Sequence, residues 1–112
     1  FECSAEWILY WMHRMEDDWE WAKDFPQISG TMSMSPTEYI RRNCYVTMEA
    51  DEGDLARPLA ELGEDRILMA TDYPHFDSES PHTVSTIRAR KDLTAAQKEK
   101  ILGGNAAALL RL

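Results

Sequence analysis

Cysteine is scarce in this sequence and long apolar runs are absent. Cys3 and Cys44 lie far apart without metal-ligand spacing, so neither a disulfide framework nor a zinc knuckle is indicated and a reducing, cytoplasmic setting is the default. Charges interrupt every apolar stretch before the roughly 20 residues that a membrane span needs, which excludes a transmembrane protein. The N-terminus lacks a secretory-signal layout and opens on Phe1, so we expect the remainder of a longer protein.

Basic residues are also few. Twelve Lys and Arg against twenty Asp and Glu give a net charge of -8, and the basic residues are scattered rather than gathered in one stripe. Such a surface repels phosphate backbones, so nucleic-acid binding is not expected. The 112 residues are 44% hydrophobic and 29% charged, which is typical of one small globular domain over residues 1–112.

The first half of the chain predicts two helices joined by a loop. Apolar residues recur every three or four positions between residues 4 and 22, which predicts a helix with a buried stripe. Residues 23–34 lose this periodicity and predict a loop. Ser35 and Glu38 match a capping box around Pro36, which predicts a short helix over residues 36–42. The stripe consists of Trp7, Ile8, Trp11, Met12, Met15 and Trp19.

The middle of the chain predicts a strand, a helix and a second strand. Residues 44–48 and 66–71 are short apolar runs, and residues 54–62 place leucines on one helical face that ends at Gly63. A helix between two strands predicts that the strands are parallel and connected right-handed.

Three more helical segments are predicted after the second strand. Ser80 and Pro81 are expected to cap a helix reaching about Arg90. Thr94 and Gln97 predict a second capping box for a helix reaching Leu102. Gly103 and Gly104 are expected to stop that helix before a final turn or two over residues 105–112.

Two parallel strands need neighbours on each side to form a stable sheet. A possible strand end at residues 1–3 would supply a third. A (β/α)8 barrel of about 250 residues has about 31 residues in each βα unit. The fold we expect is therefore α/β, the C-terminal portion (about the last three βα units) of a (β/α)8 TIM-type barrel.

Asp72 follows the second predicted strand, at the edge where parallel α/β folds place ligands. A carboxylate there can bind a divalent cation or accept a proton from a metal-bound water. Alternatively, it caps the turn before Tyr73 and Pro74. His75 lies in the same loop without a recognised metal spacing, and Glu2 would lie at another strand end. Glu49 and Asp51 also follow a strand but are expected in a solvated loop or cap.

Four segments resemble one family. Residues 64–75 (EDRILMATDYPH) resemble the eighth-strand signature of the amidohydrolase superfamily, in the amidohydrolase-related branch that includes aminocarboxymuconate-semialdehyde decarboxylase-like proteins. Residues 7–16 (WILYWMHRME), 35–48 (SPTEYIRRNCYVTM) and 101–112 (ILGGNAAALLRL) fit the same branch in order. The resemblance implies a metal-dependent barrel that hydrolyses C–N or C–O bonds or decarboxylates an aromatic or unsaturated acid.

The resemblance also implies roles for three residues. Asp72 occupies the position of the aspartate that binds the metal and acts in proton transfer. His75 would line the pocket mouth. Glu2 falls where many members carry a histidine, at the end of the sixth strand, and would line the substrate site. The implied cofactor is a divalent metal ion, with zinc or manganese expected first and cobalt or iron also suited to such ligands.

The family's other metal ligands have no counterpart, since the three histidines are His13, His75 and His82. Catalytic divalent ions usually have three or more protein ligands, so we expect an incomplete site and an inactive isolated chain. The parent enzyme would act on a small molecule and could be a homo-oligomer. The alternative is a non-catalytic interaction module that retains only the last third of the barrel, its open edges covered by a partner.

Overall fold

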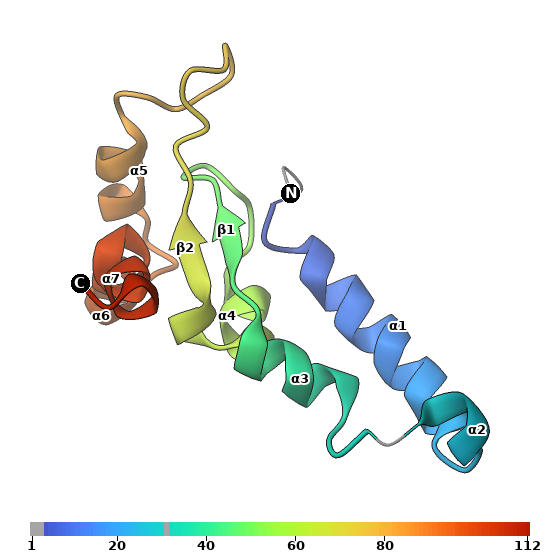
Figure 1. The fold of residues 1–112 in the computed structure, drawn as a ribbon. Helices are drawn as coiled ribbons and strands as arrows, with labels where there is room; N and C mark the ends of the chain where they lie inside the picture. The colour runs from blue at the N-terminus through green and yellow to red at the C-terminus, as the bar shows by residue number, and fades with distance from the viewer. Residues whose placement is uncertain (1–3, 31) are drawn as a thin grey trace.

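The computed structural model describes residues 4–30 and 32–112, and its fold is α/β (Figure 1). The strand expected at residues 1–3 lies outside the described residues. The elements in chain order are α1 (Trp7–Ala22), α2 (Pro26–Ser29), α3 (Pro36–Asn43), β1 (Val46–Met48), α4 (Ala56–Leu62), the 3-10 turn η1 (Glu64–Arg66), β2 (Ile67–Met69), α5 (Thr83–Ala89), α6 (Ala95–Glu99), the wide helical turn η2 (Lys100–Gly104) and α7 (Asn105–Leu110).

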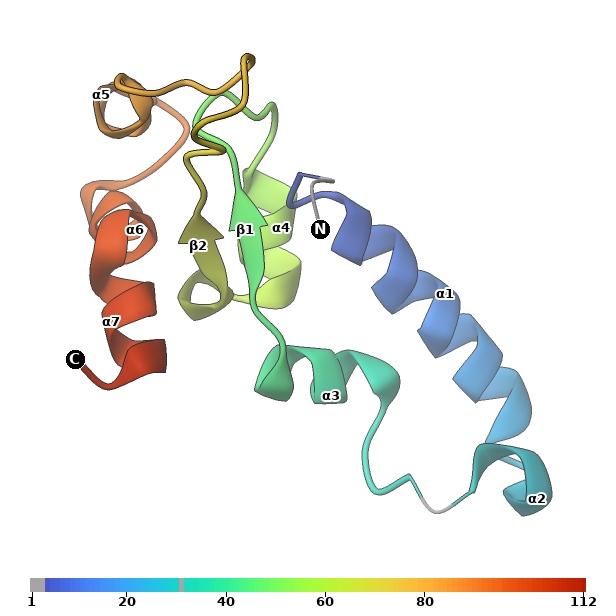
Figure 2. The ribbon, with the colours of Figure 1, turned by 45° about the horizontal axis from the view of Figure 1, so that its top comes forward.

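Helix α1 confirms the predicted helix but buries only part of the predicted stripe. Ile8, Leu9 and Met12 are buried, and the helix packs against α3 and α4. Trp11 is 48% exposed, so the expectation that it belongs to the core is wrong. The reason is visible in Figure 2, where α1 runs away from the sheet so that only its first turns lie near the strands.

Helix α3 begins with the predicted capping box. The Ser35 hydroxyl accepts a hydrogen bond from the Glu38 N–H at 3.3 Å, and the Glu38 carboxylate accepts one from the Ser35 N–H at 2.9 Å. Pro36 occupies the first turn, where its missing N–H is no loss. The loop predicted before this helix contains the single helical turn α2.

The two strands are parallel, as predicted, and Val46 pairs with Ile67 and Met48 with Met69. Val46, Met48 and Ile67 are buried, whereas Thr47 is exposed and Leu68 is half-buried. Because side chains alternate across a sheet, Thr47 and Leu68 lie on the opposite face from the buried set. That face is open to solvent within the described part of the chain.

Helix α4 joins the two strands and ends at Gly63. This glycine has a φ of 110°, a conformation that residues with a side chain rarely adopt. The helix thus ends at Gly63, as the sequence predicts, and the chain turns through η1 into β2.

The C-terminal helices differ from expectation in one place. Ser80 does not cap α5: the His82 N–H donates to the Glu79 carbonyl at 2.6 Å, which places Ser80 inside a turn, and the helix starts at Thr83. Gly103 interrupts the helix, as predicted. It bends the chain (φ 168°, ψ -24°), and helix resumes as α7. The capping box of Thr94 and Gln97 is confirmed.

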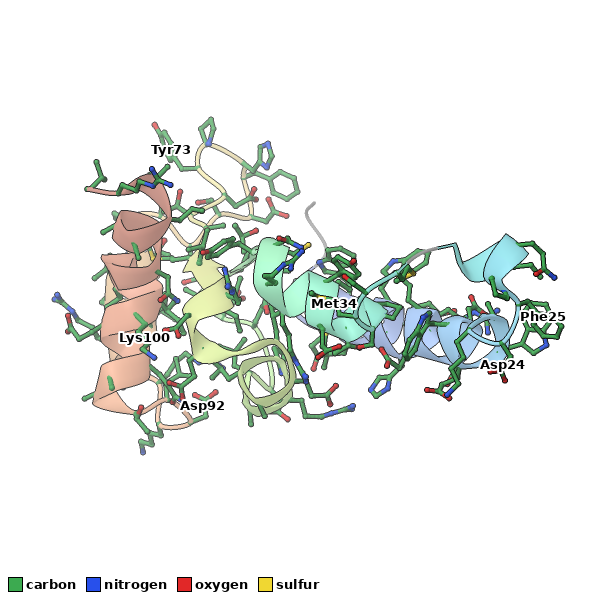
Figure 3. The ribbon with its side chains drawn as sticks, turned by 60° about the horizontal axis from the view of Figure 1, so that its bottom comes forward. Asp24, Phe25, Met34, Tyr73, Asp92 and Lys100 are labelled. Atoms are coloured by element: carbon green, nitrogen blue, oxygen red, sulfur yellow. The ribbon has the colours of Figure 1, made fainter. Side chains whose placement is uncertain are left out.

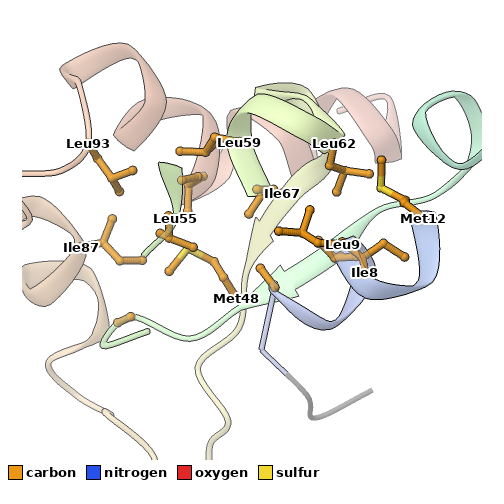
Figure 4. Packing of buried hydrophobic residues seen from close by; sticks show 14 of the residues in the cluster. Ile8, Leu9, Met12, Met48, Leu55, Leu59, Leu62, Ile67, Ile87 and Leu93 are labelled. Atoms are coloured by element: carbon orange, nitrogen blue, oxygen red, sulfur yellow. The ribbon is translucent and has the colours of Figure 1, made fainter. Parts of the chain in front are cut away.

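The hydrophobic core lies between the sheet and the surrounding helices (Figure 4). Met48, Leu55, Leu62, Ile67 and Ile87 are almost completely buried there.

Asn105 is a buried polar residue beside this core, 4% exposed. Its side-chain amide donates to the carbonyls of Glu64 and Ile67, each at 2.7 Å. One backbone acceptor in η1 and one at the start of β2 are thereby satisfied, which ties α7 to the strand and to the turn before it.

The described chain is elongated, with extents of 51 × 29 × 25 Å and a radius of gyration of 16.2 Å. A compact domain of about 100 residues has a radius of gyration of about 13 Å. The excess comes from α1 and α2, which extend to one side of the sheet (Figures 1 and 2). No helix within residues 4–30 and 32–112 combines the length and apolarity needed to cross a membrane.

Candidate metal centre

The candidate centre lies at the carboxyl ends of the two strands, where the loops after β1 and β2 meet. The Ala70 N–H donates to the Met48 carbonyl at 2.8 Å, so the pairing continues one residue beyond the strands. The long segment between β2 and α5 then projects past this edge of the sheet (Figure 2). Asp72 lies near the start of this segment, after β2, as the sequence predicts.

Asp72 has a left-handed backbone, with a φ of 54°. Aspartate tolerates this conformation better than most residues, and such positions recur at functional sites. Its backbone carbonyl accepts a hydrogen bond from the His75 N–H at 2.9 Å, which closes the turn. Its carboxylate Oδ1 lies 2.9 Å from His75 Nδ1. The Asp72 carboxylate, for which the sequence leaves metal binding and turn capping open, therefore contacts the imidazole.

Asp77 joins this pair, and sequence reasoning did not identify it. One ligand atom from each of Asp72, His75 and Asp77 lies within 4.8 Å of the other two. Asp72 is half-buried, and the other two are exposed. The only sequence signal was a third donor in the same loop, five residues after Asp72. Two carboxylates and one imidazole suit divalent cations such as zinc or manganese, so the donor set fits a metal ion.

Ser78 holds the loop in this shape. Its hydroxyl donates to the Thr71 carbonyl at 2.6 Å, and its N–H donates to the His75 carbonyl at 3.2 Å. Tyr73 lies on the outer part of the same loop with its ring exposed (Figure 3). The donors of Asp72 and His75 are thus placed by hydrogen bonds within the loop.

Glu49 brings further negative charge to this edge from β1. Burial first, and then the charges of Asp72, Asp51, Glu52 and Asp77, raise the pKa of the Glu49 carboxyl above its usual value. Glu49 is half-buried rather than fully solvated, whereas Asp51 is exposed as expected. The concentration of negative charge favours a bound cation.

Arg90 fixes the loop that follows β1. Its guanidinium donates to the carbonyls of Ala50, Glu52 and Gly53 and pairs with Asp92 through both carboxylate oxygens. The side chain of Arg90 is only 11% exposed. One buried cation thereby connects the end of α5 to the loop beside Glu49.

The Glu52 carboxylate makes a second connection. It accepts from the Glu49 N–H and from the Ala5 N–H, each at 2.9 Å. The segment that leads into α1 is thus attached to the same edge of the sheet. Arg90 and Glu52 together hold three chain segments around the candidate centre.

Among the described residues, His13 and His82 are not part of this cluster. His13 contacts Glu61 at 3.3 Å between α1 and α4. His82 occupies the residue before α5. Glu2 lies outside the described residues, so its expected place at the site stays a prediction.

Comparisons with known proteins find a matching family and similar solved structures. The sequence profile of the amidohydrolase family matches residues 6–112. The crystal structure of 5-carboxyvanillate decarboxylase LigW from Sphingomonas paucimobilis superimposes with a TM-score of 0.75 and 28% identity, over 92% of this chain and 30% of that one. An amidohydrolase from Mycobacterium avium subsp. paratuberculosis K-10 shares the fold with a TM-score of 0.80 and 24% identity, over 98% of this chain and 27% of that one.

A search of the curated proteins finds no match. The chain spans less than a third of either of these solved structures. Members of the matching family generally use divalent metals, which agrees with the donors gathered at the end of β2. Because the family profile covers nearly the whole sequence, this chain belongs to the amidohydrolase family.

Proposed function

We propose that this chain supplies the last part of a metal-dependent (β/α)8 enzyme of the hydrolase or decarboxylase type. The observation that carries the proposal is Asp72, which follows a parallel strand and lies beside His75 and Asp77 with their ligand atoms within 4.8 Å. Parallel α/β enzymes place their chemistry at this edge of the sheet.

The barrel proposal is supported by the parallel pair β1 and β2 and by the open face of their sheet. A parallel sheet is normally covered on both faces, and two strands are too few for one. Thr47 and Leu68 would then face the barrel interior, with Glu49 and Asp72 at its rim. Further strands would also cover the open edges of β1 and β2.

Asp72 is proposed as a metal ligand and as the group that receives a proton during the reaction. When bound, the metal would supply Lewis-acid polarisation of the substrate or of a water. His75 is placed to hold the Asp72 carboxylate in one orientation through the contact of 2.9 Å, and it would line the mouth of the pocket. Glu2 is proposed as a further lining residue.

Decarboxylation of an aromatic or unsaturated acid is one proposed reaction, and C–N or C–O hydrolysis is the other. The likeness to a 5-carboxyvanillate decarboxylase at 28% identity supports the first. We further propose that the isolated chain is inactive, because its described donors include only one imidazole at this edge. The proposed cofactor is zinc or manganese, and the proposed substrate is a small molecule.

Metal titration tests the proposed centre. Mn2+ added to the chain and followed by electron paramagnetic resonance should bind weakly, and Asp72→Asn should weaken binding by about tenfold because one anionic ligand is lost. Asp77→Asn should act in the same direction. Asp65→Asn is the matched control, since Asp65 is exposed at the opposite end of β2 and pairs with Lys100. Equal Mn2+ affinity for the wild type and Asp72→Asn would contradict the proposal.

The non-catalytic module remains the second candidate. It is favoured by large exposed apolar side chains, among them Trp21, Ile28 and Phe76. The encoding sequence discriminates the two functions: an upstream strand with paired histidines supports the enzyme. In that case the longer polypeptide should release CO2 from 5-carboxyvanillate or a related aromatic acid, and Asp72→Asn should abolish the release.

A further inference from the structure

The three acidic residues directly after β1 have different surroundings. The Glu52 carboxylate is engaged at both oxygens, because one accepts from the Glu49 N–H and the other from the Ala5 N–H, each at 2.9 Å. Asp51 is exposed to solvent. The Glu49 carboxylate is half-buried, and no hydrogen bond or ion pair reaches it from the residues that the structure describes. A carboxylate partly removed from water normally has such a partner.

The sheet places Glu49 on the same edge and face as the candidate centre. The Ala70 N–H donates to the Met48 carbonyl at 2.8 Å and so extends the parallel pairing. Continuing that register puts Glu49 beside Ala70, two residues before Asp72. Because side chains alternate across a sheet and Met48 faces the core, Glu49 lies on the open face. Burial is the largest cause of the raised pKa of Glu49, and the charge of Asp72 is the next.

The backbone around Glu49 is held by the protein itself. The Glu49 N–H donates to the Glu52 side chain, and the Glu49 carbonyl accepts from the Glu52 N–H at 3.4 Å. Arg90 holds the rest of the loop through the carbonyls of Ala50 and Gly53. A side chain on a fixed backbone loses less freedom when it binds a ligand, which favours affinity.

We propose that Glu49 is a further ligand of the candidate centre, so that a divalent cation is held between the ends of β1 and β2. This inference rests on the proposed function, because it adds one donor to Asp72, His75 and Asp77. Three carboxylates and one imidazole form an oxygen-rich donor set, which suits Mn2+. The cation would offset the repulsion among the carboxylates and would give Glu49 the partner that it lacks.

Mn2+ binding to the chain, followed by electron paramagnetic resonance, tests the additional ligand. Glu49→Gln should weaken binding by about tenfold, because a neutral amide replaces an anionic donor of the same shape. Glu49→Asp should also weaken binding by about tenfold, since it keeps the charge but draws the carboxylate back by one methylene. Asp51→Asn is the matched control: it removes the same charge from the same loop, and its Mn2+ affinity should stay within about threefold of the wild type.

Nuclear magnetic resonance gives a second readout that does not depend on affinity. With isotopically labelled glutamate carboxyl carbons, the resonance absent from Glu49→Gln is that of Glu49. Substoichiometric Mn2+ should broaden this resonance and leave that of Glu61 sharp, because α4 carries Glu61 to the opposite end of the sheet. The wild-type spectrum decides the question if Glu49→Asp loses its helical circular dichroism.

Three outcomes overturn the inference. One is equal Mn2+ affinity for Glu49→Gln and Asp51→Asn. Another is a Glu49→Asp variant that binds as tightly as the wild type, because charge alone would then account for the role of Glu49. The third is a Glu49 resonance that Mn2+ leaves sharp. Any of these together with weakened binding in Asp72→Asn removes only Glu49 from the centre, whereas unchanged binding in Asp72→Asn contradicts the proposed centre itself.

Discussion

Replacing Arg90 by methionine should loosen the edge of the sheet that carries the candidate centre. The substitution keeps much of the apolar stem but removes the guanidinium. It takes away the donors of the Ala50, Glu52 and Gly53 carbonyls and the two-point pair with Asp92. The loop after β1 would then lose its main attachment to α5.

The size of the effect follows from which partners water can reach. A hydrogen bond to a charged group contributes about 1.5–3 kcal/mol. The sum over the three carbonyls is therefore well above the net loss of folding stability that we expect. Ala50 is buried, whereas Gly53 is exposed and its carbonyl can be hydrated. Asp92 is 40% exposed, so solvent screens its share. We therefore expect a loss of about 3 kcal/mol, at the low end for breaking a buried pair.

Urea denaturation followed by circular dichroism measures this loss, and amide hydrogen exchange locates it. Exchange should accelerate most in residues 49–53, and Arg90→Lys should fall between Arg90→Met and the wild type. Arg88→Met is the matched control, because Arg88 is exposed in the last turn of α5, two residues before Arg90. Equal stability and equal exchange rates for Arg90→Met and Arg88→Met would refute the role of Arg90 in holding the loop after β1.

Three further predictions concern stability. Asn105→Ala should cost about 2–3 kcal/mol in thermal denaturation, because two carbonyls bonded at 2.7 Å lose their donor, and a cost below about 1 kcal/mol would show that water replaces the amide. Gly63→Ala should cost about 1–2 kcal/mol because of the φ of 110°, whereas Gly53→Ala, with open space around it, should be nearly neutral, and equal effects would argue against backbone strain. The hydrogen bond from Arg90 lowers the pKa of Asp92 in the folded chain below its usual value of 3.8. The ionised Asp92 side chain therefore adds to the free energy of unfolding above pH 3.8, and this stabilisation is lost as the pH falls through the lowered pKa. Urea midpoints measured at decreasing pH should therefore fall less steeply for Asp92→Asn, and parallel curves would count against this assignment.

Local signals in the sequence were the most reliable. Ser35 with Glu38 and Thr94 with Gln97 form capping boxes as predicted, because a cap depends on atoms within three residues of each other. The order of strand, helix and strand likewise predicted a parallel pair. The position of Asp72 at the end of β2 followed from that order.

Signals that depend on distant packing failed or were missing. Trp11 has the correct spacing for the core, but α1 diverges from the sheet and leaves its ring half exposed. The helix breaks at Gly103 as predicted, but nothing in the sequence indicated that Asn105, on α7, donates to the carbonyls of Glu64 and Ile67. Close approach also constrains Gly104, where a Cβ would lie 3.2 Å from the Glu99 carbonyl oxygen.

The candidate site also combines features that the local sequence predicts with features that depend on tertiary packing. The sequence alone determined the family, the α/β pattern and the carboxylate of Asp72 at the end of a strand, since each depends on residue type and short spacing. Only the tertiary structure decided that His75 and Asp77 converge on Asp72 and that Arg90 holds the loop near Glu49. It also decided that α1 and α3 enclose an apolar groove. The physical reason is that a spacing pattern describes one element, whereas a site or a groove depends on how separate elements pack.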